Sequence, residues 1–380
     1  MNENLQYWFK KFKDAGLIGF CFLLFESFLF QVGENDPFPK IEASMDAQEE
    51  VLFYQEINKD LLEIKFRSVQ KIRPDVVTVG NSRVNMFRAK MFEPYSFYNL
   101  SNTVVNFSRT IGLINLFDST YVPKYMFVIV EPLQFVEGFS FGVTGINIHK
   151  KGDPQIRFYK TINFLSKLGK RSKLKANWDN IGLKAIYKNR GLRTFDGSAY
   201  WGKQLSNTKE RQIELIKKSE KKLKPIFKKE IFLNYDAPLC EDAFLEFEAL
   251  NKAAQEKGVT IIGITPPYSA PIQKVLDSDS IKYQVWHDFQ KASTSERLNS
   301  YGGFYFNFSR FEYSNSKYYE MMDMIHPSEK IIGRMLVKML ENEKFRKLLP
   351  LIDIQKINDQ INSTDLPILD VFSEHPDFYK

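Results

Sequence analysis

Short apolar runs that alternate with longer helix-like stretches constrain the fold of this 380-residue chain most strongly. The runs are partly β-branched and are bounded by polar or turn-forming residues, so they predict buried strands. They cover residues 75–79, 96–100, 125–130, 259–265 and 304–308. Strands that alternate with helices favour a parallel sheet covered on both faces. The sequence therefore predicts an α/β fold with three layers, α/β/α, around a mainly parallel sheet.

Between these runs, apolar residues recur at the three- and four-residue spacing that is typical of helices. The pattern predicts helices over 83–92, 105–119, 241–257 and 327–341, and Gly258 is expected to end the third of them. A domain over residues 74–345 would contain all of these elements. Residues 34–73, with a helix over 47–71, are expected to be a helical connector, and residues 346–380 a C-terminal tail on the surface.

The N-terminal segment 15–33, AGLIGFCFLLFESFLFQVG, is apolar and follows Lys10, Lys11 and Lys13. At 1.5 Å per residue its length is near the lower limit for a membrane-spanning helix. We interpret it as an uncleaved transmembrane signal anchor. A cleaved signal peptide and a buried helix of a soluble protein are the alternatives. With the lysines on the cytoplasmic side, residues 1–14 are expected in the cytoplasm and the catalytic domain outside it, in the periplasm or at the cell surface.

The positive charge of the chain is concentrated in one region. Residues 150–230 contain 23 Lys and Arg against 7 Asp and Glu, a net charge of +16, whereas the whole chain carries +7. This region lies in a segment, 138–235, that breaks the strand–helix rhythm and is interpreted as an insertion. Its charge could face anionic lipid, an anionic polymer or nucleic acid, or form a solvated helix surface. Its aromatic residues are not spaced like a base-stacking platform, so no nucleic-acid partner is expected.

Two short motifs supply candidate catalytic groups. Ser82 lies in the sequence VGNSR, directly after the first predicted strand, and ligands bind at that edge of parallel sheets. Asp323 and His326 lie in the sequence DMIH, before the last predicted helix. A Ser hydroxyl needs a base to become a nucleophile, so His326 is the candidate base and Asp323 the group that orients it. The alternative is that Asn81 and Ser82 only cap a helix.

These motifs resemble the first and last blocks of the SGNH, or GDSL-like, hydrolase superfamily. Gly80-Asn81-Ser82 stands where the family usually has Gly-Asp-Ser, and Asp323 and His326 match its Asp-x-x-His. The segments VGNSR (79–83), FYNLS (97–101) and TPPY (265–268) are most similar to a membrane-anchored branch. That branch includes the teichoic-acid D-alanylation D proteins and the alginate O-acetylation proteins. The resemblance covers roughly residues 70–135 and 240–342.

The resemblance implies a flavodoxin-like fold and a serine esterase or O-acyltransferase. Ser82 would carry a small acyl group such as acetyl, and the substrate would be a cell-surface glycan or polymer. No cofactor is expected, and a membrane-bound acyltransferase is an expected partner. The alternative is a non-catalytic protein of the same fold that binds a polymer or assembles with such an acyltransferase.

The chain departs from the family in its second and third blocks. Ser101 follows the second predicted strand where the family usually has Gly, and Glu131 follows the third where it usually has Asn. The expected oxyanion hole therefore consists of the N–H groups of Ser82 and Ser101 and the side chain of Asn102. Arg83 and Glu131 are expected to contact substrate, with a surface ion pair and a loop cap as the alternatives.

The other histidines show no metal-binding pattern. His149, His287 and His375 have no partners at metal-ligand spacing, so no metal site is expected. The chain also contains no glycine-rich phosphate loop and no dinucleotide fingerprint. The candidate chemistry therefore depends on Ser82 and His326 meeting in space.

Overall fold

A computed structural model describes most of the chain as two compact units. One unit comprises residues 1–60 and 149–194, and the other comprises residues 61–148 and 195–380. Within them, the described residues are 11, 16–17, 19–20, 23–54, 61–139, 176–188, 190–202, 207–228 and 236–368. The predicted connector, 34–73, and the predicted insertion, 138–235, are each divided between the two units, and the predicted tail, 346–380, lies in the second.

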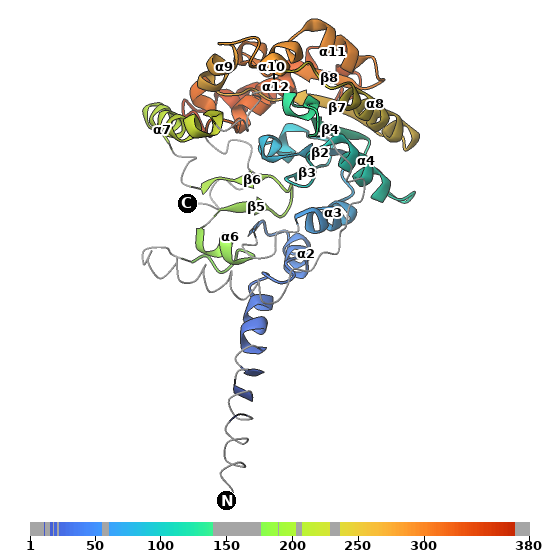
Figure 1. Cartoon of the computed structure of the whole chain (residues 1–380). Coiled ribbons are helices and arrows are strands. Elements are labelled where there is room, and N and C mark those ends of the chain that lie inside the picture. The colour runs from blue at the N-terminus through green and yellow to red at the C-terminus, as the bar shows by residue number, and fades with distance from the viewer. Residues whose placement is uncertain are drawn as a thin grey trace, which may run out of the picture. The chain divides into compact units, whose positions relative to one another are not determined.

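The second unit is built on a five-stranded parallel sheet with the strand order β3-β2-β4-β7-β8 (Figure 1). Its strands are β2 (Val76–Gly80), β3 (Phe97–Ser101), β4 (Tyr125–Ile129), β7 (Thr260–Thr265) and β8 (Phe304–Asn307). All five predicted strands are confirmed, and every end lies within one residue of its predicted position. Numbered along the chain, the five strands have the order 2-1-3-4-5 across the sheet. In this doubly wound order β3 is added on one side of β2, and β4, β7 and β8 are added on the other side.

One face of this sheet packs against α3 (Leu61–Ile72), α4 (Phe107–Leu116) and α8 (Glu241–Glu256). Figure 1 shows α4 and α8 together on one side of the strands. Alternate strand residues such as Val77 and Val79 enter this core, as the period of two in a strand requires. The rings of Phe107 and Phe247, one from each neighbouring helix, lie 5.1 Å apart there.

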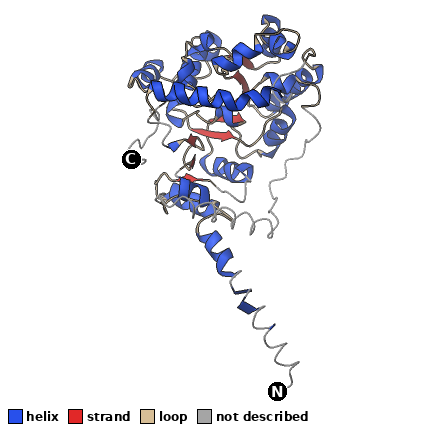
Figure 2. Ribbon diagram, turned by 60° about the vertical axis from the view of Figure 1, so that its left-hand side comes forward, coloured by secondary structure: helices blue, strands red, loops and turns tan. Residues whose placement is uncertain are grey.

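The opposite face is also covered, because Phe127 on β4 packs against aromatic rings there. Its ring centroid lies 5.8 Å from that of Phe87, 5.2 Å from that of Phe92 and 6.3 Å from that of Phe345. Phe345 belongs to α13 (Glu343–Arg346), which follows α12 (Glu329–Leu340). Figure 2 shows the strands of this unit with helices around them. The α/β class with a parallel sheet is therefore confirmed, and the arrangement is compatible with the predicted three layers.

The helix predicted over 83–92 is wrong. The chain instead forms two short 3₁₀ turns, η1 (Ser82–Val84) and η2 (Ala89–Met91). Backbone carbonyls that a helix would use internally are bonded to distant groups. The side-chain amide of Asn99 donates to the carbonyls of Val84 and Phe87, at 2.8 and 3.1 Å. These tertiary hydrogen bonds replace helical ones, which local spacing does not reveal.

The other predicted helices of this unit are confirmed with shorter bounds, as α4, α8 and α12. Gly258 follows α8 with a φ of +73°, as a helix stop requires. The residues predicted to be a tail include α14 (Ile354–Asn362), which packs on α12. The remaining elements of the unit are η3 (Pro132–Phe135), β6 (Ala199–Tyr200), α7 (Lys209–Lys228), α9 (Ala270–Leu276), α10 (Gln284–Phe289), α11 (Ala292–Asn299), η5 (Phe311–Ser314) and η6 (Tyr318–Glu320).

The first unit contains α2 (Phe38–Asp46), β1 (Leu52–Phe53), α6 (Leu183–Lys188) and β5 (Gly191–Arg193). β1 pairs with β5 in antiparallel fashion. The helix predicted over 47–71 is wrong in its first half, because the backbone of β1 is bonded to β5. Residues 55–60 of the predicted helix lie outside the described residues, and residues 61–72 form the helix α3, which belongs to the other unit.

The predicted anchor is only partly described. Among the described residues, no helix combines the length and the apolar character needed to cross a membrane. Residues 23–31 are helical, and Leu29 and Val32 pack against Leu183 and Ile186. Residues 1–10, 12–15, 18 and 21–22 of the predicted cytoplasmic end and anchor lie outside the described part of the chain. So do residues 140–175, 189, 203–206 and 229–235 of the predicted insertion and residues 369–380 of the predicted tail.

Candidate active site

The nucleophile candidate and the base candidate meet at the carboxyl edge of the parallel sheet. Ser82 directly follows Asn81 at the end of β2, and His326 lies in the loop between η6 and α12. The Oγ atom of Ser82 lies 2.7 Å from Nε2 of His326, although 244 residues separate them in sequence. β2 lies between β3 and β4, where the strand order reverses, and doubly wound proteins bind their ligands at that position.

Asp323 holds the imidazole of His326 from within the same turn. Nδ1 of His326 lies 2.9 and 2.8 Å from the two carboxylate oxygens of Asp323. Oδ1 also accepts hydrogen bonds from the backbone N–H groups of Ile325 and His326, at 2.9 and 3.0 Å. One carboxylate therefore sets both the shape of the loop and the orientation of the ring.

Electrostatics define the direction of these hydrogen bonds. Burial acts to raise the pKa of Asp323, but the hydrogen bonds from the His326 ring and from the backbone hold it below its ordinary value. An ionised carboxylate accepts hydrogen bonds only, so Nδ1 of His326 must carry the hydrogen. Nε2 is then left to accept the hydrogen bond from the Ser82 hydroxyl. The three side chains thus form a continuous relay from hydroxyl to carboxylate.

The turn that carries Ser82 depends on Gly80. This residue has a φ of +154°, and a Cβ atom added there would lie 2.5 Å from Cγ2 and 2.8 Å from Cβ of Ile129. The next residue, Asn81, accepts a hydrogen bond from the N–H of Arg83 at 2.9 Å, which tightens the turn. Gly80 thus allows the chain to leave β2 close to β4 and to present Ser82 at the sheet edge.

Replacing Gly80 by Ala is expected to destabilise the protein by about 3 kcal/mol, because the new methyl group overlaps Ile129 and the backbone angle is strained. Urea unfolding of the purified chain measures the change. Gly258→Ala is the matched control, since Gly258 also has a positive φ, +73°, but nothing within 4 Å of its added Cβ. That control should cost only about 1 kcal/mol. Equal losses at both positions would contradict the predicted overlap.

Arg83 and Glu131, which the sequence predicts to contact substrate, are paired inside the protein. They form a buried ion pair and are only 4% and 6% exposed. The guanidinium of Arg83 also donates to the backbone carbonyls of Ile325 and Pro266, at 3.1 and 2.5 Å. Both side chains are therefore used inside the protein. Substrate contact by Arg83 and Glu131 stays a prediction, and the sequence alone does not reveal partners that arrive from other loops.

The oxyanion hole predicted from the sequence is only partly possible. Ser101 is fully buried, and its N–H donates to Oδ1 of Asn99 at 2.8 Å, so the predicted Ser101 donor is wrong. The backbone N–H of Asn102 is also used, by the carbonyl of Gly80 at 2.7 Å. Its exposed side-chain amide donates to Oδ1 of Asn85 at 2.8 Å and retains a second hydrogen. Within the described residues, the N–H of Ser82 donates no hydrogen bond, so it remains a candidate donor.

A buried lysine that sequence reasoning missed supports this edge of the sheet. The ammonium group of Lys65, on α3, is 0% exposed and donates to the carbonyls of Asn99, Ser101 and Gly197, each at 2.9 Å. Burial lowers the pKa of Lys65 to about 7, and the nearby Asp196 opposes this effect. The only sequence signal for it was a Lys on the mostly apolar face of this helix.

Trp201 is a second residue near the site to which the sequence assigned no role. Its ring centroid lies 5.2 Å from that of the His326 imidazole, with 53° between the ring planes. It is half-buried, as are Ser82 and His326. The Trp201 ring therefore covers one side of the candidate base. No motif pointed to Trp201, because it lies in an irregular segment after β6.

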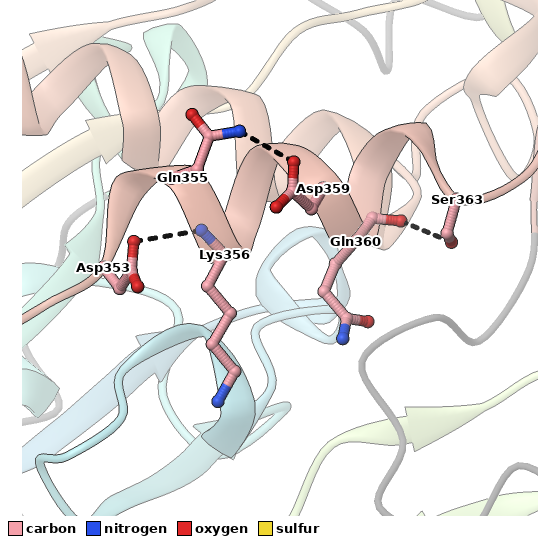
Figure 3. Close-up of a pocket in the computed structure, with 6 residues that line it drawn as sticks. All are labelled: Asp353, Gln355, Lys356, Asp359, Gln360 and Ser363. Carbon is pink, nitrogen blue, oxygen red and sulfur yellow. Dashed lines mark hydrogen bonds between the residues drawn. The ribbon is translucent and has the colours of Figure 1, made fainter.

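A surface hollow elsewhere in the unit does not belong to this site. It is formed around α14 (Figure 3) and is lined by Asp353, Gln355, Lys356, Asp359, Gln360 and Ser363. Two of these side chains bond to each other, since Gln355 donates to Asp359 at 2.7 Å. None of the three linked residues at the sheet edge lines it, so it offers no chemistry to the site.

Metal-binding residues do not gather in the described part of the chain, which contains no group of three or more His, Cys, Asp or Glu suited to an ion. One ring nitrogen of His287 lies 3.1 Å from the carbonyl of Leu276. His149 and His375 lie outside the described residues. The sequence-based prediction that no cofactor is needed therefore stays a prediction.

Comparison with known proteins assigns no family to this arrangement. No protein-family model matches the chain, and no curated protein matches its sequence. The candidate function depends on the site itself. A hydroxyl bonded to an imidazole, which is bonded in turn to an ionised carboxylate, is suited to nucleophilic acyl transfer.

Proposed function

We propose that this protein is a serine esterase or O-acyltransferase of the SGNH type. One observation carries the proposal: Oγ of Ser82 lies 2.7 Å from Nε2 of His326, whose Nδ1 is bonded to Asp323. Hydrogen-bond reach between nucleophile and base, with the base oriented by a third group, is the geometric signature of an activated serine. The position of the three residues at the reversal point of a doubly wound sheet also supports it.

The proposed reaction proceeds through a covalent intermediate. His326 accepts the hydroxyl proton through Nε2 as Ser82 attacks the carbonyl carbon of an acyl ester. When the tetrahedral intermediate collapses, the ester C–O bond breaks and the imidazolium returns the proton to the departing alcohol oxygen. Water or an acceptor hydroxyl then attacks the acyl-enzyme, with His326 again taking the proton, and Ser82 is regenerated. Asp323 stabilises the imidazolium in both steps.

A small acyl group, such as acetyl on a cell-surface glycan or polymer, is the proposed substrate. The resemblance of the motifs to the membrane-anchored SGNH branch supports this class, and the basic charge of residues 150–230 fits an anionic polymer. A membrane-bound acyltransferase is the proposed partner. These assignments rest on the resemblance and on charge, whereas the reaction class rests on the site.

An N-terminal membrane anchor with the catalytic unit outside the cytoplasm is part of the proposal. Large apolar side chains on the N-terminal segment are exposed, including Leu17 at 62%, Phe20 at 58% and Leu23 at 68%. Such exposure in water is unfavourable and is relieved in lipid. We expect the full chain to stay in the membrane pellet after alkaline carbonate extraction. Quantitative release into the supernatant would contradict the anchor but leave the reaction class untouched.

A serine-reactive phosphonate tests the reaction class directly. We expect the wild-type chain to form one covalent adduct, located by mass spectrometry on the peptide that contains Ser82, and to hydrolyse a chromogenic acetyl ester. Ser82→Ala should remove both activities. Ser300→Ala is the matched control, because Ser300 is exposed and its hydroxyl bonds only to the carbonyl of Arg297, at 2.7 Å. Labelling of the Ser82→Ala variant at the wild-type level would refute the role of Ser82.

A non-catalytic glycan-binding protein of the same fold is the second candidate. The observation that favours it is the internal use of the backbone N–H groups of Ser101 and Asn102, which leaves few donors for an oxyanion. This candidate predicts that the wild-type chain binds an acetylated glycan but neither takes the phosphonate nor turns over the ester. Adduct formation at Ser82 excludes it.

A further inference from the structure

The buried guanidinium of Arg83 is linked to both arms of the proposed catalytic pair, directly to the loop of the base and through Glu131 to the loop of the nucleophile. On the base side, its Nε donates to the carbonyl of Ile325 at 3.1 Å, and Ile325 directly precedes His326. On the nucleophile side, its Nη1 pairs with Oε1 of Glu131. The other carboxylate oxygen of Glu131 accepts a hydrogen bond from Asn81 at 2.6 Å, and Asn81 directly precedes Ser82.

The same guanidinium is fixed from a third direction by the loop after β7. Its Nη2 donates to the carbonyl of Pro266 at 2.5 Å, and its carbon atom lies 3.8 Å from the ring centroid of Tyr268. Arg83 therefore joins the loops that follow β2, β4 and β7 to the loop that carries His326. Charge-assisted bonds in a planar fork combine with a cation–π contact, which a Lys ammonium does not reproduce.

We propose that Arg83 is a positioning residue that sets the separation between Oγ of Ser82 and Nε2 of His326. This inference rests on the proposed function. Arg83 itself is 4% exposed and does not touch the reacting atoms. It acts by holding the residue before the base and, through Glu131, the residue before the nucleophile. Proton transfer between the two side chains is sensitive to such placement, because a displacement of about 1 Å costs about 100-fold in rate.

A purely structural role for Arg83 predicts lower stability but no selective effect on turnover. Arg83→Lys separates the two roles, because it keeps the charge beside Glu131 and removes the fork. We expect kcat for ester hydrolysis to fall about 100-fold with KM changed by less than about twofold. The matched control is Arg297→Lys, since Arg297 also pairs with a carboxylate, Glu241, and stacks on Phe244 at 3.9 Å, but contacts none of the proposed catalytic residues. Equal kcat values for both variants and the wild type would overturn the proposal.

Chemical rescue provides a second measurement. Arg83→Ala leaves a space lined by the Glu131 carboxylate, the carbonyls of Ile325 and Pro266 and the ring of Tyr268, all of which suit a free guanidinium ion. Millimolar guanidinium chloride is expected to restore kcat at least about 10-fold, and sodium chloride at equal ionic strength should restore none. A folded Arg83→Ala variant that does not respond would overturn the proposal. If this variant does not fold, the kinetics of Arg83→Lys decide.

A measurement that does not depend on catalysis, NMR of the His326 ring, separates this inference from the proposed function. The chain has only four histidines, so the ring nitrogens of His326 can be assigned by NMR of the full ¹⁵N-histidine-labelled chain in detergent. Arg83→Lys is expected to shift the His326 ring signals, while Arg297→Lys leaves them in place. Unchanged His326 signals in Arg83→Lys would overturn the positioning role. If the His326 signals shift in Arg83→Lys but the wild-type chain does not react with the phosphonate, the proposed reaction is refuted and the positioning role of Arg83 stands.

Discussion

Replacing His326 by Ala is expected to lower kcat for ester hydrolysis by about four to six orders of magnitude. The Ser82 hydroxyl then loses the only imidazole bonded to it, at 2.7 Å, and no longer has a base to take its proton. Substrate binding should change little, because the imidazole acts mainly in the transition state. Stopped assays with a chromogenic acetyl ester measure kcat and KM separately, and the rate of phosphonate labelling at Ser82 should fall in parallel.

Two further variants make this result specific. Asp323→Asn is expected to lower kcat by about 10⁴, because an amide can donate to Nδ1 and so reverse the required imidazole tautomer. His287→Ala is the control, since His287 is bonded to the carbonyl of Leu276 at 3.1 Å and contacts none of the three linked residues. A His326→Ala variant that keeps wild-type turnover would remove the base from the mechanism.

Replacing Glu329 by Gln is expected to destabilise the protein by about 3–5 kcal/mol. Oε2 of Glu329 lies 3.0 Å from Nε of Arg88, and both side chains are fully buried. The variant removes the Glu329 charge from the buried Arg88 guanidinium. The bonds of that guanidinium to the hydroxyl of Ser198 at 2.6 Å and the carbonyl of Ala199 at 2.7 Å are to neutral groups and do not replace the lost charge. Urea unfolding followed by far-UV circular dichroism measures the loss.

The origin of this loss is testable with a double variant. Arg88→Met combined with Glu329→Leu removes both charges and should recover most of the stability lost in Glu329→Gln. The surface pair of Lys338 and Glu341, with side chains 42% and 54% exposed, provides the control. Glu341→Gln should change the free energy of unfolding by less than about 1 kcal/mol. If Glu329→Gln and Glu341→Gln lower the free energy of unfolding by similar amounts, the burial of the Arg88 charge is not the cause.

Local patterns predicted the features of the site that depend on short stretches of sequence. A run of β-branched residues predicted β2, and its end placed Ser82 at the carboxyl edge of the sheet. Asp323 and His326 lie close in sequence, so one turn brings their side chains together. The sequence did not reveal the partners that come from distant segments. Ser101 is bonded to the buried Lys65, and Arg83 is bonded to the carbonyl of Ile325.

The helix predicted over 83–92 shows the same limit in the backbone. Its apolar spacing suits a helix, yet Asn99 bonds the carbonyls of Val84 and Phe87, and the N–H of Ala199 bonds the carbonyl of Asn85 at 2.9 Å. These outside partners compete with the helical hydrogen bonds of the same carbonyls. The helix N-terminus expected beside Ser82 is therefore replaced by a single 3₁₀ turn.

The sequence by itself determined the parallel strands, the turn that carries Ser82 and the pairing of Asp323 with His326. Each depends on residues close together in the chain, where spacing and side-chain chemistry decide the outcome. Only the tertiary structure decided that Ser82 meets His326, that Arg83 and Glu131 link the two loops and that Ser101 is enclosed. The physical reason is that buried charges and backbone carbonyls must find partners, and those partners come from whichever segments folding brings beside them.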